Sequence, residues 1–508
     1  MIPNSLTLFE VLTRYAEEEP DREIFADEQR RYTVFEALQA SLGIASFLAS
    51  KNVRKHDLVF LRATRSIDTA LLFIGLTFLG ATTALCDPHQ GVKEFADANG
   101  MLEKAKFLLT NEDASMDISA VGNFKLIHVA SGKEWDCLIP DGKTKASMDF
   151  TPCFNIYASC AIIFTSGSSD KAKPVSLSQY NLMNHCQNFA EAGSGTREDN
   201  CLMLLPIHHV FGLAEILMVI WMRCRLYFAP SLEFETTMRA IQQEKITRLD
   251  SIPAYLMALA KLKELKKVDL PSLNASLVGG TNLIEDELIY LEDALGITIC
   301  PVYGQSECIA ISGINAAGSR KERLGTVGRF LPMCDGKLID ADGKEVEAGD
   351  EGEIIVKAPS VMMGYYGDIA TTSAAIDPDG YLHTGDLGCF DENGCLHIVG
   401  RKKEIIIRNG INLSPASIEA KILKTGFFEE VAVVGIEDRL RGEVPAVAVV
   451  YKESVLSKLR LGEKEALKIV EDALLKIEYP AVTRILKSFP RLASGKVDKI
   501  ALRKMLIE

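Results

Sequence analysis

The sequence contains no Cys-x-x-Cys pair and no cysteine–histidine cluster at zinc spacing, although it has 12 cysteines and 8 histidines. This absence indicates neither a structural metal site nor a framework of disulfide bonds. A reducing environment is the simplest setting for scattered cysteines, and we therefore expect a cytoplasmic protein. The first residues, MIPNSLTLFEVL, lack the basic segment of a signal peptide, and the last, MLIE, form no peroxisomal or lipidation signal.

Long apolar runs and an excess of positive charge are also missing. The most apolar segment, ALLFIGLTFLGATTALC at 70–86, is shorter than the roughly 20 residues that a bilayer span needs. Its glycines and the CDP that follows predict a buried helix that leads into a strand. The 56 basic residues against 69 acidic ones give a formal charge of −13, which argues against nucleic-acid binding through non-specific electrostatics. The sequence does not indicate an oligomeric state.

The chain of 508 residues is too long for one compact core. Up to about residue 400, helical periodicity alternates with short apolar runs. Segments 6–18 and 34–50 are predicted to be amphipathic helices, and 57–63, 160–166 and 274–280 buried strands. This alternation predicts an α/β fold, in which a large N-terminal domain has stacked mixed or parallel sheets covered by helices.

The pattern changes at Gly325, where short strands alternate with Asp-Gly, Asn-Gly and Pro-Asp-Gly turns. Such turns are typical of antiparallel hairpins, so a small β-rich lobe is expected at about 325–400. After GRKKE the pattern returns to mixed α and β and ends in charged amphipathic helices. We place the main boundary at Lys403, which gives an N-terminal domain of 1–402 and a small α+β C-terminal domain of 403–508.

The segment TSGSSDKAKPV, which begins at Thr165, follows an apolar strand and has the composition of a phosphate-binding loop. It is not a Walker loop, because Gly167 is followed five positions later by Ala172, and Lys173 is followed by Pro174 instead of a hydroxyl residue. What remains is a hydroxyl-rich loop whose O–H and N–H groups suit a pyrophosphate, with a lysine adding charge. A plain surface connection is the alternative for this loop alone.

Seven further segments follow in order: LPIHHVFG from Leu205, GGTNL from Gly279, YGQSE from Tyr303, GEI from Gly352, YLHTGDLG from Tyr381, GRKKEIIIRNG from Gly400 and PRLASGKVDK from Pro490. Together with the phosphate loop they resemble the core motifs of the adenylate-forming superfamily, which includes acyl-CoA synthetases, non-ribosomal adenylation domains and firefly-type luciferases. The resemblance covers nearly the whole chain and is strongest to AMP-forming carboxylate–CoA ligases. It implies three ligands: ATP, Mg²⁺ and coenzyme A.

The resemblance also implies roles for single residues. Lys496 matches the lysine that bridges the substrate carboxylate and the α-phosphate, and Glu307 matches the magnesium-binding carboxylate. His209 matches a histidine that borders the acyl and adenylate sites. Nucleotide contacts are implied for the phosphate-loop residues Thr165, Ser166, Gly167, Ser168, Ser169 and Lys173, and for Gly280, Thr281, Asn282, Tyr303, Gly304 and Ser306.

Four residues of the later motifs match the ribose site and the moving domain. Asp386 matches the carboxylate that accepts hydrogen bonds from the ribose hydroxyls, and Arg401 offers the same ribose donors. Lys403 matches the hinge about which the mobile C-terminal domain rotates between half-reactions, and Gly410 the entry of the thiol. Each single match has a plainer alternative: a surface lysine or arginine, a turn, a buried aromatic ring or a core histidine.

The phosphate loop departs from the family pattern at Ser169, Asp170, Ala172 and Pro174. Asp170 places a negative charge where pyrophosphate passes, and Pro174 removes an N–H donor. We therefore expect weakened ATP binding or a loop that closes differently, with Asp170 facing solvent or a metal ion. Asn282 stands where proline is common, and RNG replaces a frequent Gly-Gly or Lys-Gly.

The stretches that wall the acyl pocket in this family are apolar here. They offer Val210, Phe211, Ile252, Val278, Ile309 and Ala310. With no carboxylate to hold an α-amine, an amino acid would leave its ammonium uncompensated. The expected substrate is therefore an apolar carboxylic acid, fatty or aryl.

The expected activity is ATP-dependent formation of an acyl-adenylate with release of pyrophosphate, followed by transfer to coenzyme A, with a link to fatty acid metabolism. Coenzyme A is the favoured acceptor because the sequence shows no carrier-protein module after the small domain and no evident long insertion. Two alternatives remain. One is a stand-alone acyl-AMP ligase that loads an acyl carrier protein, and the other is a catalytically weak homologue that binds nucleotide or an acyl ligand.

Overall fold

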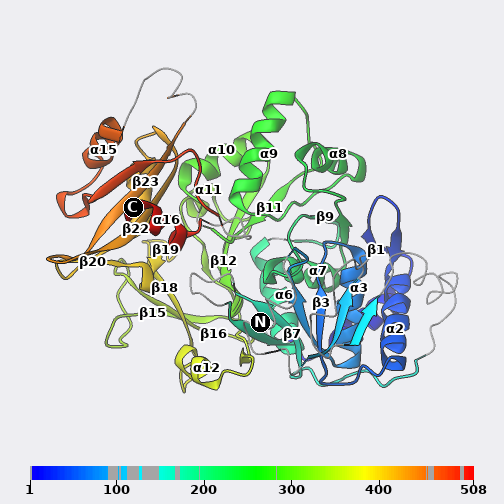
Figure 1. Cartoon of the computed structure of the whole chain (residues 1–508). Helices are drawn as coiled ribbons and strands as arrows, with labels where there is room; N and C mark the ends of the chain where they lie inside the picture. The colour runs from blue at the N-terminus through cyan, green and yellow to red at the C-terminus, as the bar shows by residue number, and fades with distance from the viewer. Residues whose placement is uncertain are drawn as a thin grey trace. The chain divides into compact units, whose positions relative to one another are not determined.

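The computed structural model describes residues 3–89, 101, 105–110, 125–128, 148–165, 172–193, 195–281, 283–452, 455, 463–491 and 497–507. The chain forms two compact units (Figure 1). Of the described residues, unit 1 comprises those up to Thr165, those from 172 to Gly336 and Val356–Leu382, and unit 2 comprises Lys337–Ile355 and those from His383 onward. The predicted boundary and hinge at Lys403 stay a prediction; these units divide the expected β-rich lobe, with 337–355 and 383–400 in unit 2 and the remainder in unit 1.

Unit 1 is a mixed α/β structure, as the alternating sequence pattern predicts. Its helices are α1 (Leu8–Glu18), α2 (Val34–Ser50), α3 (Ile67–Leu79), α6 (Gln179–Gly193), α7 (Val210–Met222), α8 (Phe234–Glu244), α9 (Pro253–Lys266), α10 (Glu285–Leu295), α11 (Arg320–Arg323) and α12 (Ile369–Ala375). Its strands are β1 (Glu23–Ala26), β2 (Arg31–Thr33), β3 (Leu58–Arg62), β4 (Thr82–Cys86), β5 (Ala105–Thr110), β6 (Lys125–His128), β7 (Ser159–Phe164), β8 (Pro174–Ser178), β9 (Asn200–Met203), β10 (Arg225–Phe228), β11 (Ala275–Val278), β12 (Thr298–Gln305), β13 (Cys308–Gly313), β14 (Arg329–Phe330) and β17 (Gly364–Tyr365).

Three sheets form the framework of unit 1. The largest has seven strands in the order β17-β8-β7-β4-β3-β5-β6, and two four-stranded sheets have the orders β2-β1-β10-β9 and β11-β12-β13-β14. From β7 to β6 the large sheet is parallel, whereas β7–β8 and β8–β17 are antiparallel pairs. The antiparallel edge is of interest because the segment predicted to be a phosphate loop lies between β7 and β8 in the sequence.

The apolar segment 70–86 forms the buried helix and strand that its sequence predicts. Every residue of α3 is buried, and β4 follows directly after the left-handed Gly80 that ends the helix. α3 packs against α2 and β4 (Figure 1). Among the described residues, none of the helices combines the length and the apolar character that crossing a bilayer demands.

Helices α6 and α7 connect the sheets of unit 1. They pack against each other, and α6 also contacts β8, β11, β12 and β13. Their apolar side chains belong to one core cluster with those of β7, β8 and β13. Helix α7 begins directly after His209, so this core holds the LPIHHVFG motif in place.

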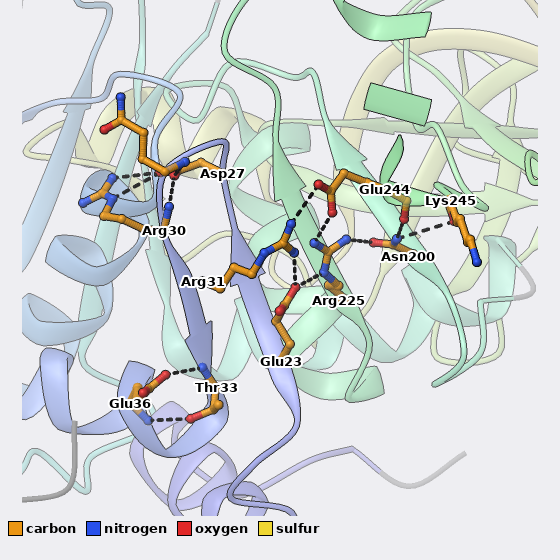
Figure 2. A network of polar contacts seen from close by, with 11 residues as sticks. Glu23, Asp27, Arg30, Arg31, Thr33, Glu36, Asn200, Arg225, Glu244 and Lys245 are labelled. Carbon is orange, nitrogen blue, oxygen red and sulfur yellow. Dashed lines mark hydrogen bonds and ion pairs between the residues drawn. The ribbon is translucent and has the colours of Figure 1, made fainter. Parts of the chain in front are cut away.

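A polar network ties the first sheet to α8 (Figure 2). Arg225 on β10 donates to Glu23 on β1, to Asn200 on β9 and to Glu244 at the end of α8. Arg31 on β2 donates to the same two carboxylates, at 2.9 Å and 2.8 Å. Four segments distant in sequence are therefore linked by one set of charges.

The β-rich lobe contains a four-stranded sheet in the order β15-β16-β18-β19. Its strands are β15 (Asp335–Ile339), β16 (Gly352–Lys357), β18 (Leu382–Phe390) and β19 (Leu396–Arg401), and β18 pairs with β19 antiparallel. The predicted Asp-Gly and Asn-Gly turns are confirmed: Gly343 donates to the carbonyl of Asp340, and Gly394 to that of Asp391.

The C-terminal part of unit 2 has one sheet with helices on both faces. Its elements are the 3₁₀ helix η2 (Lys402–Glu404), β20 (Ile406–Arg408), β21 (Ile411–Leu413), α13 (Pro415–Leu423), β22 (Phe428–Asp438), β23 (Gly442–Tyr451), α15 (Glu463–Asp472), the 3₁₀ helix η3 (Lys476–Glu478), β24 (Val482–Ile485) and α16 (Lys499–Ile507). Alternate side chains of β22 and β23 face α13 and α15 on one side and α16 on the other. This small α+β structure is the one that the sequence predicts.

Candidate functional site

The phosphate-loop segment lies at the end of the β7–β8 hairpin. The N–H of Thr165 donates to the carbonyl of Lys173 at 3.0 Å, and the N–H of Lys173 donates to Thr165 Oγ1 at 3.1 Å. These bonds close the base of the loop. The segment after it is a strand that begins at Pro174, where a missing N–H is tolerated, so the exclusion of a Walker loop is confirmed. Residues 166–171, including Ser166, Gly167, Ser168, Ser169 and Asp170, lie outside the described residues.

Ser306 and Glu307 form the two-residue turn between β12 and β13. Both are half-buried, and Tyr303 on β12 is half-buried as well. Gly304 must lack a side chain, because a Cβ there would lie 1.8 Å from the carbonyl oxygen of Ile309. The close approach of the two strands therefore fixes the position of the turn.

Tyr365 on β17 contacts both sides of the predicted phosphate site. Its hydroxyl donates to Glu307 Oε1 at 2.8 Å, and Lys173 Nζ lies 4.8 Å from the centre of its ring. Burial raises the pKa of Tyr365, and the Glu307 carboxylate raises it further, so the phenol stays protonated and donates. The analysis of the sequence missed this residue, since a tyrosine in GYY carries no signal of its own.

His209 precedes α7 but does not cap it through its side chain. Its ring lies 4.4 Å from that of His208, centre to centre, and His208 Nε2 is 3.9 Å from Asp87 Oδ2. Burial lowers the pKa of His208, against the raising effect of Asp87. The two histidines are half-buried and directly precede α7, the helix that carries Val210 and Phe211 of the predicted acyl pocket.

Several residues of the predicted acyl wall lie together in unit 1. Phe211 packs edge-on against Phe189 at 5.4 Å between ring centres. A Cβ at Gly279 would lie 3.6 Å from the Phe211 ring, and one at Gly280 would lie 3.4 Å from Ile252. Gly280 also has φ +87°, which favours glycine. Val278, Ile309 and Ala310 are buried, Val210 is half-buried, Thr281 is exposed, and Asn282 lies outside the described residues.

Unit 2 brings Asp386 and Arg401 together. They are direct partners across β18 and β19, and Arg401 Nε lies 2.9 Å from Asp386 Oδ1. Asp386 is only 4% exposed, and burying a carboxylate costs free energy that a paired base offsets. Nearby on the same sheet, Glu353 of the GEI motif pairs with Lys402 at 2.8 Å and with His383 at 3.5 Å. Burial raises the pKa of Glu353, but these two bases outweigh it and the pKa is lowered.

Lys403 and Gly410 lie on neighbouring elements of unit 2. Lys403 is exposed in η2, and the next residue, Glu404, accepts a hydrogen bond from Lys499 of α16 at 2.8 Å. Gly410 and Asn409 form the turn between β20 and β21, and both have positive φ. Lys496 lies outside the described residues.

The chemistry of the donors in unit 1 suits a magnesium-bound nucleotide. Mg²⁺ is held in proteins by one or two carboxylates together with substrate phosphates, and Glu307 offers such a carboxylate near Lys173. The Tyr365 hydroxyl uses part of the acceptor capacity of Oε1, and the carboxylate keeps capacity for a hard cation. In the part of the chain that the structure describes, no group of three or more potential metal ligands gathers, so a dedicated all-protein metal cage is not found there.

Comparisons with known proteins agree with these observations. The family model described as "AMP-binding enzyme" matches residues 12–366, and that described as "AMP-binding enzyme C-terminal domain" matches residues 417–496. The indoleacetate–CoA ligase of Aromatoleum aromaticum is 32% identical over 346 residues, which are 68% of this chain and 67% of that protein. The 2-succinylbenzoate–CoA ligase of Bacillus cereus is 28% identical over 496 residues, or 96% of each chain.

Solved structures show the same fold. The ATP-bound MatB from Rhodopseudomonas palustris has a TM-score of 0.87 at 23% identity and covers 99% of each chain. The O-succinylbenzoate coenzyme A synthetase of Bacillus subtilis, in complex with ATP and magnesium ion, has a TM-score of 0.83 at 25% identity and covers 98% of this chain and 99% of that one.

Proposed function

Because this chain belongs to the AMP-binding enzyme family, we propose that it is an AMP-forming acid–thiol ligase. It joins a carboxylic acid to the α-phosphate of ATP, releases pyrophosphate, and passes the acyl group from the adenylate to the thiol of coenzyme A. The observation that carries the proposal is the meeting of Glu307 and Lys173 on Tyr365, at the base of a hydroxyl-rich loop. This reaction needs a carboxylate that can bind a metal ion and an ammonium that can bind phosphate in one place.

The residues of unit 1 supply the charge chemistry of the first step. Lys173 and the hydroxyl groups of the loop bind the phosphates, and the Ser306 hydroxyl adds a donor. Glu307 holds Mg²⁺, which neutralises phosphate charge and polarises the phosphoryl oxygens when it is bound. Tyr303 lies against the adenine, and Gly280, Thr281, Asn282 and Gly304 complete that wall.

Residues of unit 2 are assigned the ribose contacts and the lysine of the adenylation step. Asp386 accepts hydrogen bonds from the ribose hydroxyls, and Arg401 orients its carboxylate. Lys496 binds the attacking carboxylate and the α-phosphate together, which lowers the repulsion between two anions. Lys403 acts as the hinge of the C-terminal domain, 403–508, between the two half-reactions, and Gly410 lines the thiol entry.

The substrate is an apolar acid, with an aryl acid favoured over a fatty acid. Phe211, Phe189 and Ile252 present apolar surface to the predicted acyl site. The names of two relatives point the same way, since they are CoA ligases for indoleacetate and 2-succinylbenzoate. His209 borders the carboxylate end of the substrate. A cytoplasmic location stays a prediction.

The experiment measures pyrophosphate release from Mg-ATP with a panel of acids: acetate to palmitate, benzoate, cinnamate, indoleacetate and several amino acids. We expect release that depends on an aryl or fatty acid and turns over only with coenzyme A. Lys496→Ala should lower the rate about 10²- to 10³-fold, as loss of one preorganised donor does. Lys504→Ala, an exposed lysine of α16, is the matched control and should keep the wild-type rate.

Other outcomes would contradict the proposal in distinct ways. Release that stalls near one equivalent with coenzyme A present, and resumes with an acyl carrier protein, identifies the carrier as the acceptor. Binding of ATP by calorimetry without release from any acid identifies a catalytically weak homologue.

A further inference from the structure

We propose that Tyr365 is a positioning residue of the adenylation step, which holds the Glu307 carboxylate through its hydroxyl and the Lys173 ammonium through its ring face. The inference rests on the proposed function, because it needs Glu307 to bind Mg²⁺ and Lys173 to bind phosphate. It adds a residue from a separate segment to the motif residues of the site.

The Glu307 side chain needs a partner to hold one orientation. It stands on a two-residue turn, is half-buried and has three rotatable bonds, so its backbone alone does not aim the carboxylate. Tyr365 is 8% exposed and reaches Oε1 at 2.8 Å, a good hydrogen-bond distance for a hydroxyl and a carboxylate. A tyrosine has only two side-chain torsions and a rigid ring, so little freedom remains in the pair.

The backbone around Tyr365 is fixed to both halves of the site. Residues Gly364 and Tyr365 pair with Ser176 and Val175 of β8, the strand that follows the phosphate loop. The N–H of Met362 donates to the carbonyl of Glu307 at 2.8 Å. One short segment is therefore bonded to the phosphate hairpin and to the Glu307 turn, and the distance between them depends on it.

Helix α12 holds the strand from the other side. The N–H of Tyr365 donates to Thr372 Oγ1 at 2.9 Å, and the same hydroxyl donates to the carbonyl of Asp368 at 2.7 Å. A Cβ at Gly364 would lie 2.7 Å from Thr372 Cγ2, so helix and strand are closely packed. The ring of Tyr365 is thus presented at a fixed place beneath Lys173.

Lys173 gains an orientation from the ring. Its side chain is exposed and flexible by nature, while its backbone is tied to Thr165. The ring centre lies 4.8 Å from Nζ, within the range of a cation–π contact. The Lys173 ammonium and the Glu307 carboxylate therefore contact the same side chain, so the proposed phosphate and metal ligands are both oriented by Tyr365.

Two variants separate the two contacts. Tyr365→Phe removes the hydroxyl and keeps the ring, and Tyr365→Leu removes both. Tyr366→Phe is the matched control, since it removes a hydroxyl from the next residue of the same segment. The readouts are the Mg²⁺ dependence and KM for ATP of acid-dependent pyrophosphate release, and the binding of Mn²⁺ to the protein–ATP complex without acid, followed by electron paramagnetic resonance.

For Tyr365→Phe we expect about 10- to 100-fold weaker Mn²⁺ binding and a matching rise in the Mg²⁺ requirement, the usual effect of losing a partner of a metal-ligating carboxylate. The rate should recover at high Mg²⁺, and KM for ATP at saturating Mg²⁺ should stay close to wild type. Tyr365→Leu should raise that KM in addition. Tyr366→Phe should match wild type, and all values are taken at a temperature where circular dichroism shows each variant folded.

The outcomes distinguish this inference from the proposed function. If the wild type releases no pyrophosphate with any acid, the proposed function fails first. If the wild type turns over and Tyr365→Phe keeps wild-type Mn²⁺ affinity and Mg²⁺ dependence, the positioning role is overturned. A double variant with Glu307→Gln gives a second check: Tyr365→Phe should add no further loss of Mn²⁺ binding there, and an additive loss would contradict action through Glu307.

Discussion

Replacing Gly304 with alanine should damage the site through the backbone. The added Cβ would lie 1.8 Å from the carbonyl oxygen of Ile309 and 2.5 Å from its carbonyl carbon. A carbon and a carbonyl oxygen in contact normally stand about 3.3 Å apart, so the two strands must separate by about 1.5 Å at this point. The neighbour is backbone and not the end of a flexible side chain, so the strain cannot be relieved by a rotamer change.

The displaced segment carries the Ser306–Glu307 turn. A misplacement of about 1 Å at a catalytic group can cost about 10²-fold, so we expect kcat/KM for ATP to fall about 100-fold, which corresponds to about 2.7 kcal/mol of transition-state stabilisation. Overpacking of this kind also lowers the free energy of unfolding by about 1–3 kcal/mol. Pyrophosphate release and urea unfolding measure the two effects.

A second glycine provides the control. Gly343 has φ +79° and no atom within 4 Å of a built Cβ, so alanine there adds only backbone strain, of about 1–2 kcal/mol. Gly343→Ala should therefore lose stability and keep the wild-type kcat/KM. The reasoning is refuted if Gly304→Ala keeps both quantities, or if the two variants lose activity equally.

Two further changes test other parts of the chain. Arg225→Ala should lower the free energy of unfolding by about 1–3 kcal/mol, because it leaves the largely buried Glu244 with one base. Arg31→Ala changes a side chain that is 51% exposed and should lower it by less than about 1 kcal/mol. Equal losses in urea unfolding would contradict this difference. Burial raises the pKa of Glu244, but the hydrogen bonds from both arginines outweigh burial and the pKa is lowered in the folded protein. The network therefore stabilises the folded state above the unfolded pKa of about 4.3, and this stabilisation disappears as the pH falls through the folded pKa. The loss of stability caused by Arg225→Ala should become smaller in acid. Asp386→Asn should raise KM for ATP about tenfold or more, since hydrogen bonds to a charged group contribute about 1.5–3 kcal/mol. KM for the acid should stay unchanged. An unchanged KM for ATP would contradict a role of Asp386 in binding the ribose.

The fold class could be predicted because the apolar segments and the turn signals of the sequence indicate the same α/β structure. The apolar segment 70–86 is too short to cross a membrane, and its apolar residues predicted a buried helix that leads into a strand. The structure contains this helix and strand as α3 and β4. The Asp-Gly and Asn-Gly signals predicted turns that the backbone hydrogen bonds of Asp340 and Asp391 confirm. The contacts place 337–355 and 383–400 of the expected β-rich lobe in one compact unit with the C-terminal sheet and the remainder of the lobe in unit 1, and the boundary at Lys403 stays a prediction.

The site was predictable in part for a physical reason. In each motif the residue that the backbone requires and the charged group stand close together in the sequence or on one hairpin: Gly304 stands three residues before Glu307, and Asp386 pairs with Arg401 across β18 and β19. The roles of these residues and of Lys496 stay predictions until the variants are measured.

Tyr365 shows why the remainder could not be predicted. It comes from a segment that pairs with β8 and is separated by 58 positions from the carboxylate that it contacts. Only the antiparallel edge of the large sheet brings that segment beside the phosphate hairpin, and no spacing along the chain encodes this approach. A site of this kind is therefore specified at two levels. Motifs place the groups that react, and the sheet edge supplies the side chain that aims them.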